Sequence, residues 1–314
     1  MVTILIPVYN TAKFLRCCLD SIIAQTYQDF QVVLVDDGST DESLAICKEY
    51  AHKYPYIEVH HQENAGVAAA RNKLLSHVTG DYVLFVDSDD WIEPQTVEYL
   101  VTEAQRSQAD IVTCEAIIND QPITNKEIKK EEWTQKHAVY EFLRHVTFNG
   151  SLWNKLLKAE QIKGIQFAKG ISYGEDALFI WQVLQRVKKV LITNCQLYHY
   201  RMNETSISHQ TFGSSKMTSH IVWDCIERDT AQLWPQYLDV ARASFAISDM
   251  WLLYFAAQSN YRRDLHIRIF QQNIRRSYKQ MWNAQILGKQ KLIFAYIISV
   301  NYRLGRALLS LLKK

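Results

Sequence analysis

The chain opens with residues 2–40, VTILIPVYNTAKFLRCCLDSIIAQTYQDFQVVLVDDGST, where two apolar runs flank a segment with apolar residues at helical spacing. Residues 2–8 and 31–35 are short runs rich in Val, Ile and Leu, which is typical of buried strands. Residues 13–24 have the periodicity of an amphipathic helix. This order predicts a strand, a helix and a second strand parallel to the first.

The same alternation continues through the next seventy residues. We expect strands at residues 57–60, 82–86 and 110–114 and helices at residues 41–54, 67–76 and 94–107. Such alternation is typical of a mostly parallel sheet covered by helices, and strands buried on both faces read as continuous apolar runs. The predicted fold class is therefore α/β, with a central, mostly parallel sheet.

Polar residues follow three of these strands directly. They are Tyr9-Asn10 after the first strand, Asp36-Asp37-Gly38-Ser39 after the second and Asp87-Ser88-Asp89-Asp90 after the fourth. In parallel sheets, ligands bind at the carboxyl ends of strands, where helix N-termini present free N–H groups. The sequence therefore predicts a functional site at this edge of the sheet.

The acids Asp87, Asp89 and Asp90 allow two interpretations. Carboxylates this close raise one another's pKa unless they share a cation, and oxygen ligands favour Mg²⁺ or Mn²⁺. The alternative is a helix cap before Pro94. On spacing alone, both interpretations stay open.

The other polar motifs are similarly open. Asp37 either accepts hydrogen bonds from a nucleotide or belongs to a plain turn, and Arg71 either pairs with a phosphate or is a surface charge. Asp176 is either a general base or an acid that complements a helix dipole. His199 is either structural or a metal ligand, beside an Arg201 that can offset diphosphate charge.

Together these motifs resemble the family 2 inverting glycosyltransferases of the GT-A fold over about residues 1–210. The resemblance rests on Pro7-Val8-Tyr9-Asn10, Val35-Asp36-Asp37-Gly38-Ser39, Asn64-Ala65-Gly66, Ala70-Arg71-Asn72, Asp87-Ser88-Asp89-Asp90, Trp153-Asn154-Lys155, Gly174-Glu175-Asp176 and His199-Tyr200-Arg201. Each motif is weakly specific, whereas their order and spacing together are highly specific.

The resemblance implies a role for each position. Val8 and Asp37 would contact the nucleotide base with Arg71 beside it, Asp87 would face the ribose, Asp89 and His199 would bind the metal, and Asp176 would be the catalytic base. The wider donor side comprises Pro7, Tyr9, Asn64, Gly66, Ser88 and Arg201, and the acceptor side comprises Trp153, Asn154, Lys155 and Glu175.

The resemblance also implies the reaction. A hexosyl or N-acetylhexosaminyl group would pass from a nucleoside diphosphate sugar, UDP-linked, to a hydroxyl of a glycan, glycoprotein or lipid-linked acceptor, with Mn²⁺ or Mg²⁺ as cofactor. The alternatives are a nucleotidyltransferase, whose glycine-rich phosphate loop is not found at residues 9–12, and a non-catalytic sugar-nucleotide-binding protein.

Domain limits follow from the patterns along the chain. We expect a GT-A domain at residues 1–213, with a nucleotide half at 1–115 and an acceptor half at 116–213, and a helical region at 214–314. Residues 119–133 are polar and charged and predict a solvated excursion. Six cysteines without a CxxC pair, and no secretory leader at residues 1–8, predict a reduced, cytoplasmic protein.

The C-terminal region is strongly basic. Residues 261–314 contain twelve Lys and Arg and one acid, so residues 1–260 carry a net charge of −9 within a total of +2. The apolar run at 292–300 is too short to span a bilayer, and no nucleic-acid recognition motif is present. Residues 291–314 predict either a basic amphipathic helix on an anionic membrane surface or a helix packed in the core.

Overall fold

The computed structural model describes residues 1–119, 121–124, 127–202, 212–259, 261 and 264–312. The chain folds into two compact units. The first comprises Met1–Ala138, Ser151–Lys169 and Phe179–Asn203, and the second comprises Val139–Gly150, Gly170–Leu178 and Glu204–Lys314.

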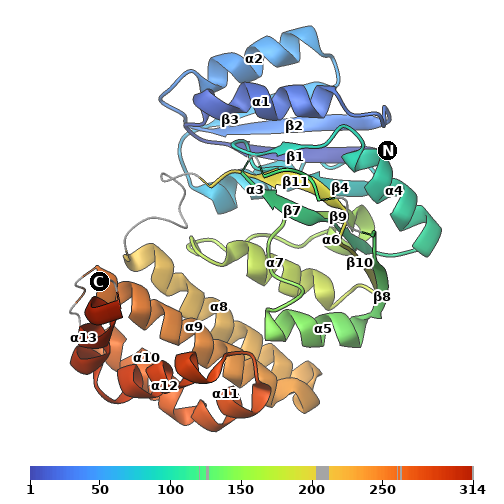
Figure 1. Cartoon of the computed structure of the whole chain (residues 1–314). Coiled ribbons are helices and arrows are strands. Elements are labelled where there is room, and N and C mark those ends of the chain that lie inside the picture. Colours follow the sequence, from blue (N-terminus) through green and yellow to red (C-terminus); the bar gives the residue numbers. More distant parts are fainter. Residues whose placement is uncertain (120, 125–126, 203–211, 260, 262–263, 313–314) are drawn as a thin grey trace. The chain divides into compact units, whose positions relative to one another are not determined.

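The first unit is built on an eight-stranded mixed sheet in the order β3-β2-β1-β4-β9-β6-β10-β8 (Figure 1). Its strands are β1 (Val2–Val8), β2 (Phe30–Asp37), β3 (Ile57–Gln62), β4 (Tyr82–Phe85), β6 (Ile111–Thr113), β8 (Lys130–Thr134), β9 (Lys155–Lys158) and β10 (Lys189–Thr193). Strand β1 pairs in parallel with β2 and β4, and β2 pairs in parallel with β3. The predicted α/β alternation over the first 114 residues is confirmed.

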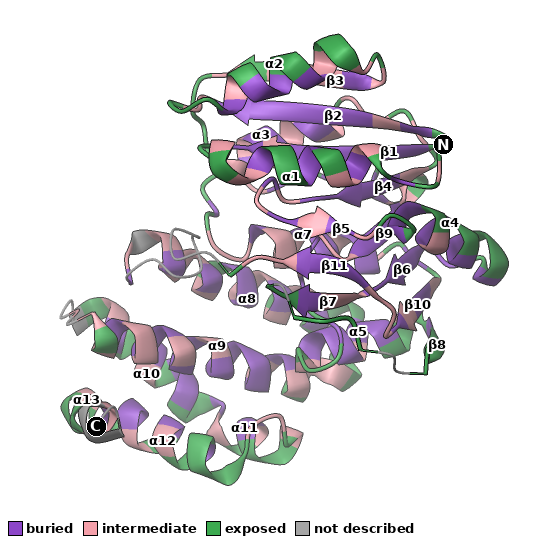
Figure 2. Cartoon of the chain, turned by 45° about the horizontal axis from the view of Figure 1, so that its top comes forward, coloured by how far each residue is buried: buried purple, intermediate pink, exposed green. Residues whose placement is uncertain are grey.

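Helices cover both faces of β1, β2 and β3. Helices α1 (Ala12–Ile23) and α2 (Ser43–Lys53) lie on one face and α3 (Val67–Leu75) lies on the other (Figures 1 and 2). Helix α1 buries Leu15, Cys18, Leu19 and Ile22, which share one face at helical spacing. Strand β2 is buried along nearly its whole length, which explains its continuous apolar sequence.

A second, three-stranded sheet lies beyond the fourth strand. Its order is β5 (Trp91–Ile92), β11 (Gln196–Tyr200) and β7 (Glu115–Ile118). Strand β11 runs antiparallel to β5, with His199 opposite Trp91, and parallel to β7. This pairing brings residues from near position 200 beside the acids that follow β4.

Further helices follow strands of the first unit along the chain. Helix α4 (Thr96–Ser107) follows β5, α5 (Gln135–Arg144) follows β8, and α6 (Ala159–Ile162) follows β9. Helix α5, like α7 (Glu175–Leu184), contributes residues to both units.

The second unit is helical, as expected for the C-terminal region. Its elements are α8 (Ser214–Leu233), the 3₁₀ turn η2 (Pro235–Tyr237), α9 (Leu238–Gln258), α10 (Asp264–Arg276), α11 (Tyr278–Ala284), α12 (Lys289–Val300) and α13 (Tyr302–Leu312). Leu253, Phe270, Met281 and Ile298 are among its buried core residues. Among the described helices, none combines the length and apolar character needed to cross a membrane.

Residues 139–150 and 170–178, which the sequence assigned to the acceptor half, group with the helical unit. The ring of Phe142 lies 6.5 Å from that of Trp223, and Ser244 Oγ donates a hydrogen bond to the carbonyl of Leu143. The Tyr173 N–H donates to Thr218 Oγ1 at 2.9 Å. These contacts are between residues far apart in the sequence, so the local sequence pattern does not reveal them. The domain limit at residue 213 stays a prediction.

Strands β8 and β9 are among those that the sequence did not predict. Strand β9 inserts antiparallel between β4 and β6, and β8 pairs antiparallel with β10 inside the segment expected to be solvated. Trp133 of β8 is only 6% exposed, and its burial explains why a strand forms among charged neighbours.

Candidate functional site

Hydrogen bonds join the ends of β1, β2 and β4. The N–H of Asn10 donates to Ser39 Oγ at 3.0 Å, and Asn10 Oδ1 accepts from the N–H of Thr40 at 2.8 Å. Thr11 Oγ1 lies 3.0 Å from Ser88 Oγ, to which it donates. The structure therefore brings the three polar strand ends together at one edge of the sheet, as the sequence predicted.

The first strand end presents Tyr9 rather than Val8. Val8 is 1% exposed and packs in the core, while Tyr9 is 49% exposed and Pro7 is half-buried. The side chain of Val8 is thus covered by protein, and we expect any side-chain contact with a nucleotide at this strand to come from its two neighbours.

Asp37 organises the loop that leads into α3. Its Oδ1 accepts from the N–H of Ala65 at 2.9 Å and from Gln62 Nε2 at 2.7 Å, and its Oδ2 accepts from the N–H of Gly66 at 2.8 Å. The side chain is buried. Asp37 is therefore more than a turn residue, because it fixes the exposed residues Asn64 and Gly66 beside the second strand end.

Gly38 allows this loop to approach closely. Its φ is +72°, and a Cβ there would lie 2.7 Å from the backbone nitrogen of Asn64. A larger residue would face both the left-handed backbone and this contact. These two steric constraints explain why a glycine follows the two acids.

The loop after β4 is held by Tyr198 of β11. The hydroxyl of Tyr198 donates to Asp90 Oδ2 at 2.8 Å and accepts from the N–H of Asp87 at 3.1 Å. Asp90 Oδ1 also accepts from the N–H of Arg201 at 2.8 Å. Asp90 is 1% exposed, and burial together with the nearby Asp87 raises its pKa.

The helix-cap interpretation of these acids is wrong. Helix α4 begins at Thr96, its N-cap residue is Gln95 without a side-chain cap, and β5 lies between the acids and the helix. Asp87 and Asp89 must therefore be explained by something other than capping.

Asp89 is a suitable cation ligand. Burial, and then the charge of Asp87, raise the pKa of Asp89 to about 6. Two carboxylates that raise each other's pKa in this way are stabilised in their ionised forms when they share a cation. The two half-buried carboxyls Asp87 and Asp89 thus fit Mg²⁺ or Mn²⁺, which bind through one or two carboxylates plus substrate phosphates.

Arg71 is buried instead of lying on the surface. Its Nη2 lies 3.5 Å from Asp87 Oδ1, and its guanidinium carbon lies 5.6 Å from the ring centre of Phe167. The side chain comes from α3, whose start is fixed by Asp37. The structure therefore brings together Arg71 and Asp87, two of the residues predicted for the donor site.

Arg201 also contacts the acidic loop. Its Nε donates to the carbonyl of Asp89 at 2.9 Å, and its guanidinium carbon lies 4.5 Å from the ring centre of Trp91 and 5.0 Å from that of Phe14. Sequence reasoning found Arg201 but missed both aromatic rings, which carry no motif of their own.

His199 is engaged with groups that the sequence did not indicate. Its Nε2 lies 2.6 Å from Glu93 Oε1, and its ring stacks on Trp91 at 4.6 Å. Its Nδ1 is buried and makes no hydrogen bond with a described residue. The Nε2 contact positions the ring, and a role of His199 in the metal shell stays a prediction.

The predicted acceptor motif forms its own network. The ring of Trp153 stacks on Tyr198 at 4.7 Å and on Tyr200 at 5.4 Å. Lys155 is 1% exposed and its Nζ donates to the carbonyl of Ser151 at 2.7 Å and to Asn154 Oδ1 at 2.8 Å. Trp153 and Asn154 are half-exposed, whereas the buried Lys155 stabilises the loop that presents them.

Glu175 and Asp176 begin α7. Asp176 is half-buried and its Oδ1 accepts from the N–H of Ala177 at 2.8 Å, whereas Glu175 is 9% exposed. The acid thus complements the start of the helix, as one interpretation required. Because both residues belong to the second unit, their role toward a donor stays a prediction.

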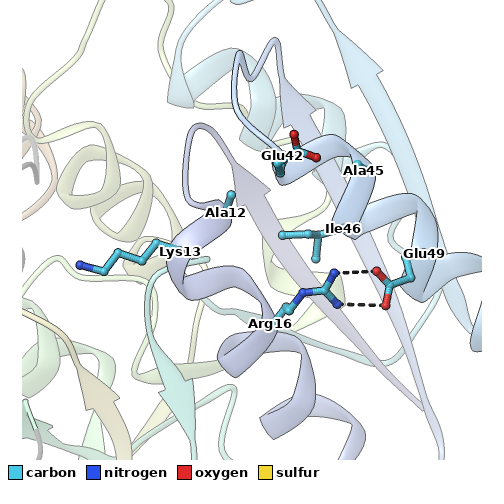
Figure 3. Close-up of a pocket in the computed structure, with 7 residues that line it drawn as sticks. All are labelled: Ala12, Lys13, Arg16, Glu42, Ala45, Ile46 and Glu49. Atoms are coloured by element: carbon cyan, nitrogen blue, oxygen red, sulfur yellow. Dashed lines mark hydrogen bonds and ion pairs between the residues drawn. The ribbon is translucent and has the colours of Figure 1, made fainter.

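A separate pocket lies between α1 and α2. Its volume is about 520 Å³, and a two-pronged ion pair between Arg16 and Glu49, at 2.9 and 2.6 Å, closes one side (Figure 3). Ala12, Lys13, Glu42, Ala45 and Ile46 complete the lining. None of the predicted site residues lines this pocket.

The fold and the site define the class of protein. The chain superposes on Staphylococcus aureus TarS, solved with UDP-GlcNAc, with a TM-score of 0.62 at 17% identity, covering 97% of this chain and 92% of that one. It also superposes on the Pyrobaculum calidifontis mannosyltransferase PcManGT, solved with GDP-Man and Mn²⁺, with a TM-score of 0.55 at 17% identity, covering 100% and 87%. The fold is that of the GT-A glycosyltransferases, followed by a helical region.

The chain belongs to glycosyl transferase family 2, whose family model matches residues 3–168. It is similar to the glycosyltransferase GlyA of Streptococcus pneumoniae, with 40% identity over 225 residues, covering 66% of this chain and 31% of GlyA. It spans less than two thirds of the length of the first curated relatives that it matches.

Removing the Tyr198 hydroxyl tests whether it holds the acidic loop. Tyr198→Phe leaves the N–H of Asp87 and the buried carboxyl of Asp90 without this partner, so we expect the free energy of unfolding to fall by about 2 kcal/mol. Chemical denaturation measures the change. Tyr56→Phe is the matched control, because the Tyr56 hydroxyl makes no hydrogen bond with a described residue; equal stability of the two variants would contradict the role of Tyr198.

Proposed function

We propose that the chain is an inverting, metal-dependent glycosyltransferase that acts in glycan or surface polysaccharide assembly. It takes a sugar from a nucleoside diphosphate sugar, UDP-linked, and transfers it to an acceptor hydroxyl. The main support for this proposal is that hydrogen bonds join the ends of β1, β2 and β4, near which Asp37, Arg71, Asp87 and Asp89 lie. The membership of the chain in glycosyl transferase family 2 supports it further.

The donor is bound by groups from each strand end. Asp37 and the loop that it fixes lie on the base side with Arg71 beside them, Asp87 lies on the ribose side, and Arg201 offsets the charge of the diphosphate. TarS was solved with UDP-GlcNAc, which supports a UDP-linked donor for the present chain. An N-acetylhexosaminyl or hexosyl group is accordingly the transferred unit.

Asp89 holds the divalent cation, with Asp87 beside it and His199 close to the same loop. Mn²⁺ or Mg²⁺, when bound, neutralises the charge that develops on the leaving diphosphate. The raised pKa of Asp89 supports this assignment, as does the Mn²⁺ in the PcManGT structure. Arg201, whose Nε is held by the carbonyl of Asp89, adds a fixed positive charge to the same loop.

Asp176 is the catalytic base in this proposal. Its carboxylate takes the proton of the acceptor hydroxyl, the hydroxyl oxygen bonds to the anomeric carbon, and the bond from that carbon to the diphosphate breaks. A single displacement of this kind inverts the anomeric configuration. Glu175, Asn154 and Lys155 belong to the acceptor side, where the half-exposed ring of Trp153 offers an apolar surface for a sugar.

A panel of nucleotide sugars with Mn²⁺ tests the reaction and the role of Asp176. We expect one donor to release its nucleoside diphosphate in the presence of glycan acceptors. Asp176→Asn should lower this rate by at least about 100-fold and leave nucleotide affinity within a few-fold, because the base acts only in the chemical step. Asp239→Asn, which changes an acid in the first turn of α9, is the matched control.

The outcomes separate the proposal from its alternatives. Retained turnover in Asp176→Asn would remove this residue from the base role. Release of pyrophosphate from a nucleoside triphosphate and a sugar phosphate would instead indicate a nucleotidyltransferase. Binding of a donor without transfer to any acceptor would indicate a non-catalytic binding protein.

We also propose that the helical region binds an anionic membrane surface, where a lipid-linked acceptor would be found. Helix α12 exposes Lys289, Ile293, Tyr296 and Val300 at spacings of four, three and four residues, so that they share one face. Ile293, Tyr296 and Val300 are 55%, 55% and 57% exposed. The opposite face, with Leu292, Ala295 and Ile298, is buried in the core.

Positively charged residues lie near the exposed apolar side chains Ile293, Tyr296 and Val300. Lys289 is exposed at the start of this face, whereas Lys291 lies on another side of α12, with its Nζ 5.5 Å from the ring centre of Trp251, and the exposed Arg303 belongs to α13. Arg262, Arg263, Lys313 and Lys314 of the basic tail lie outside the described residues. Exposed apolar side chains with cations nearby are typical of helices that lie on anionic bilayers. The single helix predicted at residues 291–314 is instead two helices, α12 and α13, and α12 packs one face in the core and exposes the other.

Vesicle flotation tests the membrane proposal. The full chain should float with phosphatidylglycerol vesicles and much less with phosphatidylcholine vesicles, and salt should weaken the binding. Ile293→Ser combined with Tyr296→Ser should abolish flotation. The matched control is Ile221→Ser combined with Leu233→Ser, since these α8 side chains are 51% and 52% exposed. Equal flotation of both double variants, or none by the unaltered chain, would contradict the proposal.

A further inference from the structure

A cluster of two histidines and one glutamate is formed by β3 and the segment that follows α3, and β2 and β1 separate β3 from β4, the strand before Asp87 and Asp89. Glu58 and His60 are two residues apart on β3, so their side chains point to the same face. His77 follows the end of α3, the helix that covers one face of the neighbouring strands. Strand β3 is an edge strand of the large sheet.

The ligand atoms of the three residues converge. Glu58 Oε1 lies 2.8 Å from His60 Nε2 and 3.5 Å from His77 Nδ1, and the two imidazole rings stack at 3.8 Å. All three ligand atoms lie within 4.8 Å of one another. Among the described residues, no other group of three His, Cys, Asp or Glu side chains meets this condition.

The nitrogen of His60 lacks a conventional partner. Its Nε2 is buried, and although Glu58 Oε1 is close, the pair does not have the geometry of a hydrogen bond and no other described residue supplies one. Buried polar atoms are normally satisfied. A cation between the carboxylate and the two imidazoles would satisfy the nitrogen and all three ligands at once.

A second set of contacts fixes the carboxylate. Glu58 Oε2, the oxygen that faces away from His60, accepts from Gln31 Nε2 at 3.2 Å. Gln31 Oε1 in turn accepts from Thr79 Oγ1 at 2.6 Å. Outer hydrogen bonds of this kind orient metal ligands and hold the free oxygen toward the ion.

We propose that Glu58, His60 and His77 bind one divalent transition-metal ion, with Zn²⁺ preferred. Two imidazole nitrogens and one carboxylate oxygen form a ligand set typical of Zn²⁺, with the fourth position open to water because the side chains are only partly buried. Imidazole ligands disfavour Mg²⁺ and favour Zn²⁺, Ni²⁺ and Co²⁺. The site is thus chemically distinct from the oxygen-ligand site at Asp89.

The ion has a structural role in this proposal. It joins the edge strand β3 to the segment that follows α3, and β3 and α3 themselves flank the loop that Asp37 fixes. Edge strands are held on one side only, so a metal link across β3 and this segment stabilises the sheet margin. Gln31 is a positioning residue, because it acts through the Glu58 carboxylate.

Cobalt substitution tests the site directly. Adding Co²⁺ to the full chain should give a visible d–d absorption band, and saturating Zn²⁺ should abolish the band and raise the Tm by at least about 3 °C. His60→Gln, His77→Gln and Glu58→Gln should each lose both signals. Gln31→Ala should weaken Co²⁺ binding by about tenfold.

Two control variants decide where the ion binds. His52→Gln changes an exposed histidine in the last turn of α2 and should keep both signals. Asp89→Asn should also keep them, whatever the transferase activity of the chain. Absence of a Co²⁺ band, a band that survives loss of His60 and His77, or one that disappears in Asp89→Asn would overturn the proposal.

Discussion

The hydroxyl of Tyr198 is the contact on which the candidate site depends most. It joins β11 to the acidic loop after β4, across 108 residues to Asp90 and 111 residues to Asp87. The hydroxyl is buried together with the carboxyl of Asp90, so each would be costly to leave unsatisfied. With Asp90 thus engaged in holding the loop, Asp87 and Asp89 remain half-buried at the strand end.

This contact explains why neighbouring acids have different environments. Asp90 accepts from Tyr198 and Arg201 and belongs to the framework, and Asp37 similarly uses both oxygens to fix the start of α3. Asp89 has a pKa raised to about 6 by burial and by Asp87. Hydrogen bonding, and not position in the motif, therefore decides which acids hold the loops in place and which are suited to bind a cation.

Much of the first unit could be predicted from the sequence, because its elements are local. The apolar runs at 2–8 and 82–86 have the length and the continuous apolar character of buried strands, so each is recognisable from its own residues. The polar residues after them mark the strand ends. Tyr198, Glu93 and Trp91 could not be found in this way, since their roles arise from the pairing of β11 with β5. The insertion of β9 into the sheet has the same origin in long-range pairing.

We propose that the ends of β1, β2 and β4 form a nucleotide site that a cation at Asp89 completes. The most direct test is calorimetric titration of UDP into the chain with and without Mn²⁺. We expect Mn²⁺ to tighten binding at least about tenfold at neutral pH, less at about pH 5 where protons occupy Asp89, and not at all in Asp89→Asn. UDP affinity that is independent of Mn²⁺, or Mn²⁺ dependence that survives in Asp89→Asn, would contradict the claim.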